Sequence, residues 1–505
     1  MRKRQIALPA ALAIVLGGLS PAFAGTFRAA EKNGVPGEYL VVLRADAAKL
    51  SLEAGKSKLP RAQTVASHLA RQHHGKVARV WDRALRGFLF QGTETEARKL
   101  ASHPSVESVE QNFSVRGEEL IAAPAASCYA LDGYPWGSLI GRTPPSTSPQ
   151  TIACDDSDPT HDGGKNSQPP RCRDNWGLDR IDQRSSTRDG LYTFDRTGRV
   201  PGVVHPLIMF LDSGINSRHQ EFIGLNGRNR AAAIDVTGDT SCPPTSDTLG
   251  HGTHVAAIAA GRTFGVAKDS DVLMIRTLSC AASGYVSYPS WVVDGLNAAA
   301  GHRPGVLNWS GGNFQSWIFN NAIRTAVQGV VSSGVLVIQA AGNQSSPYVV
   351  PATSPAAYPT GVEDACSWSF GTLPGVLVVG GVDPNGARWT RHLSGDLPGT
   401  FCPPDCGSNV GSCIDLWAPA ANVISAAGRP DDSYSYCRLS GTSMAAPHAA
   451  GVAALYLQAH PLATPAQVEA ALVSSATAGA LNVTPNSPNR IGPGSPNLLL
   501  YSKIP

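Results

Sequence analysis

The feature that most constrains the fold is the alternation of apolar runs with helix-like segments from residue 175 onward. These runs are continuously apolar, which is typical of parallel strands buried on both faces. Predicted strands are 207–211, 272–278, 306–309, 335–340 and 376–379, and predicted helices are 254–260, 291–299, 320–332 and 444–457. The pattern predicts an α/β fold, a doubly wound and mostly parallel sheet with helices on both faces. Active sites of such folds lie at the carboxyl ends of the strands.

A smaller unit is predicted before this domain, with a core at residues 37–119. It opens with an apolar run at 39–43, continues with a helix at 62–73 and a strand-rich stretch at 77–90, and closes at 106–111. The closing segment alternates in polarity, which predicts an edge strand. The unit is therefore interpreted as a small α+β domain.

Residues 1–24 have the pattern of a secretory signal peptide. Arg2-Lys3-Arg4 precede an apolar run from Ile6 to Leu19, and the small-residue site Ala22-Phe23-Ala24 follows. A membrane anchor is the alternative, disfavoured by the short run. We expect a secreted, extracellular protein, with transit through a periplasm left open, and no association with a membrane after signal removal.

All ten cysteines lie from Cys128 onward, an even number in a chain with a predicted export signal, so disulfides are expected. Residues 123–174 form a Pro- and Gly-rich insert interpreted as a long loop pinned by such bonds. Residues 124–505 carry a slight excess of acidic side chains, which excludes the basic surface of a nucleic-acid-binding protein.

Three residues are suited to nucleophilic catalysis. Asp212 directly follows the predicted strand 207–211, His251 lies between two glycines before a helix of small residues, and Ser443 precedes another such helix. A serine at a helix N-terminus has its own backbone N–H and the positive end of the helix dipole beside a developing oxyanion. Taken singly, each residue also fits an ordinary role as a turn residue, a core histidine or a helix cap.

Asn343 adds a polar side chain just past the predicted strand 335–340, where its amide can donate to an oxyanion. Along the chain the order is Asp, His, Asn, Ser. This order excludes the Ser-Asp-His order of α/β-hydrolases and the His-Asp-Ser order of the β-barrel proteases.

These segments resemble the subtilase family, and within it the proteinase K and aqualysin-like branch. The resemblance rests on three motifs, Asp212-Ser213-Gly214-Ile215, His251-Gly252-Thr253-His254-Val255 and Gly441-Thr442-Ser443-Met444-Ala445-Ala446-Pro447-His448. Residues 25–122 resemble an inhibitor-type propeptide and residues 175–505 a subtilisin-like catalytic domain. Residues 123–174 have no counterpart in this resemblance.

The resemblance implies a secreted serine endopeptidase that hydrolyses peptide bonds through an acyl-enzyme. It implies a catalytic triad of Asp212, His251 and Ser443, with Asn343 in the oxyanion hole. The chemistry requires no cofactor. The implied partners are protein or peptide substrates and the chain's own propeptide as an intramolecular inhibitor, and a monomer is expected.

The substrate backbone is expected to pair as an extended strand beside residues 308–312, and mainly small residues are expected to line its pocket. These residues are Asn308, Ser310, Gly311, Gly312, Ala341 and Gly342. Such a pocket has little side chain and no charge, which predicts a preference for apolar or aromatic residues before the cut. The family commonly has Asn-x-Ser-Leu-Gly-Gly where this chain has Asn308-Trp309-Ser310-Gly311-Gly312, so an apolar wall residue is missing or replaced.

The resemblance also implies two disulfides, Cys242 with Cys280 and Cys366 with Cys413. The pairing of the remaining cysteines stays open, namely Cys128, Cys154, Cys172, Cys402, Cys406 and Cys437. A structural calcium site is implied by Asp415 and the carbonyls of Pro374 and Val376. An ordinary surface aspartate explains Asp415 equally well.

The tail of the small unit, 113–116, is expected to lie in the active-site groove as a product-like strand. We place the maturation cut between about Glu119 and Ser127, made by Ser443 itself, with a cut near Arg171 as the alternative.

Two other classes stay open. One is a catalytically inactive binding protein on the same scaffold. The other is a metallohydrolase using His251 and His254, although Gly252 stands where the zinc-peptidase motif needs a glutamate.

Overall fold

The computed structural model of the chain describes the following residues: 25–45, 61–116, 128–130, 150–153, 176–194, 206–224, 227–268, 270–280, 286–311, 320–345, 363–391, 406–428, 435–484, 490–492 and 494–504. The predicted signal peptide, most of the insert at 123–174, the proposed cut region and Gly312 lie outside these residues.

A nine-stranded sheet forms the larger domain, in the order β11-β12-β10-β14-β15-β16-β17-β21-β20. Neighbouring strands are parallel, except that β20 and β21 are antiparallel. The strands are β10 (Leu207–Asp212), β11 (Ala231–Asp235), β12 (Asp271–Arg276), β14 (Gly305–Trp309), β15 (Val335–Ala340), β16 (Val376–Val382), β17 (Leu416–Pro419), β20 (Thr477–Ala478) and β21 (Leu498–Leu499). The mostly parallel α/β fold predicted from the apolar runs is confirmed.

Helices cover both faces of this sheet. The main helices are α5 (His251–Ala260), α6 (Pro289–Ala299), α8 (Asn321–Ser332), α9 (Thr442–Ala459) and α10 (Pro465–Ser475). Side chains of β10 alternate between two cores: Ile208 and Phe210 pack in the cluster that contains α5 and α9, whereas Met209 and Leu211 pack in the cluster that contains α6 and α8. This alternation explains why the strand is apolar at every position before Asp212.

The smaller domain is a five-stranded sheet in the order β1-β5-β2-β4-β3, backed by two helices. Its elements are β1 (Thr26–Arg28), β2 (Gly34–Leu43), α2 (Arg61–Gln72), β3 (Lys76–Trp81), β4 (Gly87–Gln91), α3 (Glu94–Ala101) and β5 (Val106–Phe113). The prediction that the closing strand lies at an edge was wrong. Strand β1 pairs in parallel with β5 and covers its outer side, so β5 lies inside the sheet.

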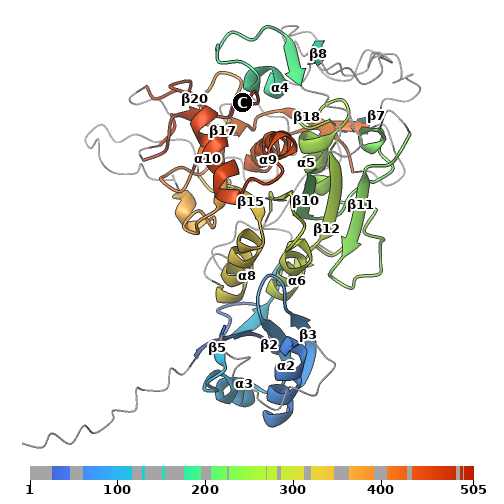
Figure 1. Cartoon of the computed structure of the whole chain (residues 1–505), viewed down its shortest axis with the longest axis vertical. Coiled ribbons are helices and arrows are strands. Elements are labelled where there is room, and N and C mark those ends of the chain that lie inside the picture. The colour runs from blue at the N-terminus through green and yellow to red at the C-terminus, as the bar shows by residue number, and fades with distance from the viewer. Residues whose placement is uncertain are drawn as a thin grey trace, which may run out of the picture.

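The small domain rests on α6 and α8, the two helices at its end of the larger domain (Figure 1). Its side chains Leu40, Val42 and Trp81 belong to the same apolar cluster as those two helices, so the two domains share a continuous core. A two-residue strand, β6 (Val115–Arg116), then pairs antiparallel with β13 (Val286–Ser287).

Shorter elements complete the described part. They are β7 (Cys128–Ala130), β8 (Gln150–Ala153), α4 (Trp176–Ile181), β9 (Leu191–Phe194), η5 (Gln220–Phe222), η6 (Ala365–Ser367), β18 (Val423–Ala426) and β19 (Ser435–Leu439). Strand β19 pairs with β18 and with β7, where Cys437 is opposite Cys128 in the backbone register. Among the described residues, no helix has both the length and the apolarity needed to cross a bilayer.

Candidate active site

Asp212 and His251 meet at the carboxyl edge of the sheet. Asp212 is the last residue of β10, and His251 is the first residue of α5. The Nδ1 atom of His251 lies 2.8 Å from Oδ1 of Asp212, and both side chains are buried. Since a carboxylate only accepts, the imidazole donates from Nδ1, which fixes the tautomer with Nε2 available as a base.

The charge around His251 favours its protonated form. Burial alone lowers the pKa of an imidazole, but here the charge and hydrogen bond of Asp212, helped by the charge of Asp247, outweigh burial. The pKa of His251 is therefore raised above its ordinary value. An imidazole that gains a proton readily in a buried site is suited to general-base chemistry.

Ser443 occupies the first turn of α9, after Gly441 at the N-cap. Gly441 has φ 149°, a value in the region that favours glycine. The Ser443 hydroxyl donates to the backbone carbonyl of Ser310 at 2.8 Å, and the Ser310 hydroxyl donates in turn to the Ser443 carbonyl at 2.9 Å. Asn308 donates from Nδ2 to the Ser310 hydroxyl at 2.8 Å, so Asn308 supports the segment that holds the serine.

The side-chain oxygen of Asn343 is fixed by the start of α9. It accepts hydrogen bonds from Thr442 N at 2.9 Å and from the Thr442 hydroxyl at 2.7 Å. These bonds assign the amide orientation, because both partners donate, and they leave the NH₂ group facing away from Thr442. That group lies 3.2 Å from the position that a Cβ on Gly441 would occupy, and so close to the start of the serine-bearing turn.

Of the other predicted substrate-binding residues, the structure describes Gly311, Ala341 and Gly342. Gly311 has open space where a side chain would project. Ala341 is fully buried and its carbonyl accepts from Asn409 Nδ2 at 3.0 Å, while Gly342 has φ 97° and donates from its N–H to the Thr442 hydroxyl at 3.2 Å.

The sequence did not predict one strand that pairs with the small domain. The strand β13 (Val286–Ser287) pairs with Val115 and Arg116 from the tail of the small domain. A two-residue strand is too short for its side chains to show a period, so no signal was available. The tail was expected to lie in the active-site groove as a product-like strand; it does form a strand with β13, and its place in the groove stays a prediction.

The small domain is held by polar contacts as well as by the shared core. Both carboxylate oxygens of Glu110 accept from the first N–H groups of α8, those of Asn321 and Ala322, at 3.0 Å each. A carboxylate at this end of a helix is favoured by the dipole. On α6, Asp294 accepts from Trp81 Nε1 at 2.6 Å and pairs with Arg79.

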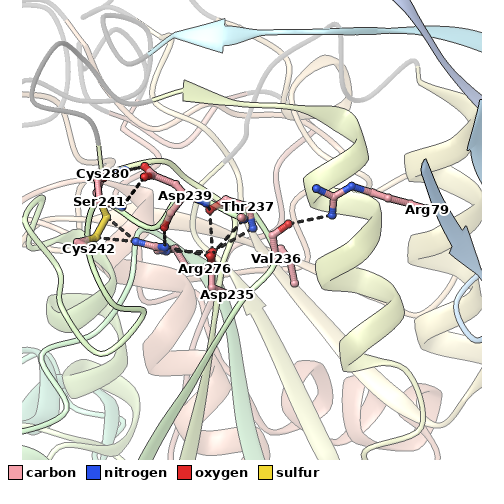
Figure 2. Close-up of polar contacts among 10 residues, drawn as sticks. Arg79, Asp235, Val236, Thr237, Asp239, Ser241, Cys242, Arg276 and Cys280 are labelled. Atoms are coloured by element: carbon pink, nitrogen blue, oxygen red, sulfur yellow. Dashed lines mark hydrogen bonds and ion pairs between the residues drawn. A yellow bond between two sulfur atoms is a disulfide. The ribbon is translucent and has the colours of Figure 1, made fainter. Parts of the chain in front are cut away.

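A buried arginine organises the loop between β11 and α5 (Figure 2). Arg276 is fully buried, pairs with Asp235 at 3.1 Å and donates to the carbonyl of Asp239. It also contacts both sulfurs of the disulfide that joins Cys242 and Cys280. In the sheet register Arg276 is opposite Asp212, so this cluster fixes the strand next to that residue.

Other cysteines are also joined. Cys366 and Cys413 form a disulfide with a Cα–Cα distance of 5.1 Å. Cys406 is disulfide-bonded, while Cys154, Cys172 and Cys402 lie outside the described residues.

Asp415 is partly buried beside β16. It is in contact with Val378, whose N–H donates to Oδ2 of Asp415 at 2.7 Å. Burial raises the pKa of Asp415 to about 7, the bond from Val378 opposes the rise, and the charge of Glu469 adds to it.

His254 has a structural position in α5. Its Nε2 donates to the carbonyl of Cys437 at 3.1 Å, and burial lowers its pKa to about 3. In the part of the chain that the structure describes, no three or more His, Cys, Asp or Glu side chains are grouped as a metal site.

A buried Asp–His pair and a serine at a helix N-terminus, gathered at the carboxyl edge of a parallel sheet, are typical of α/β serine hydrolases. A model of the subtilase family matches residues 205–494, and a model of peptidase inhibitor I9 matches residues 38–117. The chain belongs to the subtilase family and is a subtilisin-like serine endopeptidase that carries an I9 inhibitor propeptide.

Named relatives include an extracellular serine proteinase of Thermus sp., 32% identical over 480 residues that cover 93% of this chain and 90% of that protein. An alkaline serine exoprotease A of Vibrio alginolyticus is 32% identical over 429 residues, covering 85% of this chain and 60% of that protein. A crystal structure of a cold adapted subtilisin-like serine proteinase has 33% identity and a TM-score of 0.47, and covers 65% of this chain and 97% of that one.

Proposed function

We propose that this endopeptidase uses Asp212, His251 and Ser443 as its catalytic triad. The observation that carries the proposal is the buried 2.8 Å contact between His251 Nδ1 and Asp212 Oδ1 at the edge of the sheet where Ser443 begins α9. Ser443 turns away from the Ser310 carbonyl, gives its proton to His251 Nε2 and attacks the scissile carbonyl. His251 then protonates the leaving amine, and water releases the acyl group by the same steps.

The oxyanion of the tetrahedral intermediate is bound by the Ser443 N–H and the Asn343 amide. The contacts of Thr442 support this role. Thr442 donates twice to the side-chain oxygen of Asn343, which fixes the amide and leaves its NH₂ group to donate to the oxyanion. Donors fixed before the reaction need no reorganisation when the negative charge develops.

Protein or peptide substrate adds as an extended strand along Val286–Ser287 and Ser310–Gly312. The pairing of Val115 and Arg116 with Val286 and Ser287 supports this path. Because small residues line the groove, the pocket before the cut accepts apolar or aromatic side chains. The propeptide, occupying the same path, acts as the intramolecular inhibitor.

The protein is secreted as a precursor and acts as an extracellular monomer with a structural calcium ion. Secretion is supported by the signal-like residues 1–24 and by the extracellular proteinase of Thermus sp.. The calcium would be held by Asp415 and the carbonyls of Pro374 and Val376, and would neutralise buried negative charge with no part in the chemistry.

A serine-directed phosphonate tests the triad. It should abolish activity and add its mass at Ser443 alone, and Asp212→Asn should slow the labelling strongly because the tautomer of His251 is lost. Absence of labelling, with binding to peptides retained, would support the inactive binding protein. Full inhibition by a chelator without phosphonate labelling would support the metallohydrolase.

A further inference from the structure

A second carboxylate lies behind the triad. Asp247, four residues before His251, is 1% exposed and accepts four hydrogen bonds. Its Oδ1 accepts from the Ser213 hydroxyl at 2.8 Å and from Gly250 N at 2.9 Å. Its Oδ2 accepts from Thr253 N at 2.8 Å and from the Thr253 hydroxyl at 2.7 Å.

The direction of both hydroxyl bonds is fixed by a third partner. The Ser213 hydroxyl accepts from Gly252 N at 3.0 Å, and the Thr253 hydroxyl accepts from Asn216 N at 2.9 Å. Since each hydroxyl already accepts from a backbone N–H, its own proton points to Asp247. All four partners therefore donate, which favours the ionised carboxylate, whereas burial and the charge of Asp212 act the other way and raise the pKa of Asp247 above its ordinary value.

These bonds join the two loops that carry the catalytic pair. Ser213 follows Asp212 and donates from its N–H to Asp212 Oδ1 at 2.8 Å, the same oxygen that contacts His251. Gly250 and Thr253 flank His251 in the first turn of α5, where Gly250 offers no side-chain cap. Asp247 thus caps α5 and, through Ser213, anchors the loop after β10 to it.

We propose that Asp247 is a positioning residue for the Asp212–His251 pair, setting both its geometry and the basicity of the imidazole. The proposal rests on the triad of the proposed function. It adds a second negative charge near His251, separate from that of its direct partner. The Ser213 hydroxyl only links the loop after β10 to Asp247. Asp247 completes this link and also places a negative charge near His251.

The charges that face His251 within the described residues are few. Asp212 from β10 and Asp247 from the loop before α5 are the two carboxylates that raise its pKa, against the effect of burial. His254 on α5 and His448 on α9 have pKa values lowered by burial to about 3 and about 4, so both are neutral across the working range. Loss of the charge of Asp247 should therefore lower the pKa of His251.

The test compares Asp247→Asn, Ser213→Ala and Ser213→Thr in the full-length chain. The variants are matured in trans by wild-type enzyme where needed and normalised by titration with a serine-directed phosphonate. Asp247→Asn should lower kcat by about tenfold to a hundredfold with KM nearly unchanged, because misplacement of a catalytic group is costly. It should also move the acid limb of the kcat/KM profile to lower pH by about half a unit.

The serine variants separate geometry from charge. Ser213→Ala should lower kcat without moving the acid limb, and Ser213→Thr, which keeps the hydroxyl, should restore kcat. Asp179→Asn is the matched control, since Asp179 is a fully buried carboxylate that accepts from Asp189 N and Gly190 N in another part of the molecule. It should change stability without changing the pH profile.

The Ser443→Ala variant tests the triad separately from the positioning role of Asp247, because activity that survives this variant overturns the triad itself. With the triad intact, wild-type kcat and an unmoved acid limb in Asp247→Asn would overturn the positioning role. If Asp247→Asn does not fold, Ser213→Ala decides: unchanged kcat there overturns the proposal as well.

Discussion

Gly329 of α8 lies directly against Ala84 of the propeptide: a Cβ built on Gly329 would come within 1.6 Å of the Ala84 carbonyl oxygen. The propeptide backbone therefore approaches the helix at a point where only glycine fits. We expect Gly329→Ala to weaken the propeptide complex, although alanine by itself strengthens a helix by about 1 kcal/mol. The measurement is the rate at which activity emerges from the processed complex. Ser332→Ala, an exposed change on the same helix, should leave this rate unaltered.

The inhibitory complex should loosen as the pH rises. Burial raises the pKa of Asp294 to about 6 and also raises the pKa of Glu110. Glu110 is buried and Asp294 is partly buried at the contact between propeptide and catalytic domain. After separation their pKa values return towards the ordinary value near 4, so the complex holds more protons than the separated domains. Affinity is therefore highest below about pH 4 and is lost as the pH rises through about 6.

This dependence is measured as propeptide dissociation from the processed complex between pH 5 and pH 8.5. Asp294→Asn, which cannot ionise, should flatten the curve. Faster release at pH 5 than at pH 8 would show that breaking the Arg79 ion pair, rather than relief of burial, controls the complex.

Replacement of Asn343 should reduce catalysis without reducing substrate binding. Asn343→Ala removes one of the two proposed oxyanion donors, for which about a hundredfold to a thousandfold loss of kcat is expected. Thr442→Val provides the control, because it removes the hydroxyl that fixes the Asn343 oxygen but keeps the amide donor. A loss of kcat in Thr442→Val as large as that in Asn343→Ala would assign the effect to local structure.

Processing should require Ser443. Ser443→Ala should accumulate as an uncleaved species beginning near Gly25, because we propose that the chain itself makes the cut between about Glu119 and Ser127. N-terminal sequencing after expression in a host without other extracellular proteases measures this. Normal processing of the variant would mean that another enzyme makes the cut.

Calcium should raise the melting temperature most at alkaline pH. Without the ion, the pKa of Asp415 in the folded protein is about 7. The protonated carboxyl therefore stabilises the fold at pH values below the ordinary pKa of an aspartate, and this stabilisation is lost as the pH rises through about 7. A bound cation favours the ionised form and reverses this loss, by several degrees at most. Asp415→Asn should abolish the response, and equal melting temperatures of the wild type in calcium and chelator at pH 8 would contradict the site.

The sheet could be predicted because its strands carry apolar side chains on both faces, as Ile208 and Met209 show by packing in opposite cores. Helix starts were predicted less well. Helix α5 begins at His251 rather than at residue 254, and α9 at Thr442 rather than at residue 444. In both helices, backbone N–H groups of the first turn donate to side chains outside the helix. In α9, the N–H of Thr442 donates to the side chain of Asn343, which is 99 residues away in the chain.

Long-range pairing also hid parts of the site. Strand β5 was predicted as an edge because nothing in the three residues Thr26–Arg28 marks them as a strand until they pair with it. The strand β13 (Val286–Ser287) likewise acquires its structure from its partner. The motifs around Asp212, His251 and Ser443 were visible because each combines a polar residue with small neighbours at a strand or helix end.

Helix α9, which carries Ser443 in its first turn, is buried along most of its length and packs on β14, β15, β16 and β17. Segments packed in this way open only when the whole domain opens. Thermal inactivation should therefore follow the unfolding rate of the domain, with each surviving molecule retaining full turnover. The serine and the turn that holds it should therefore be lost together, in the same step in which the core unfolds.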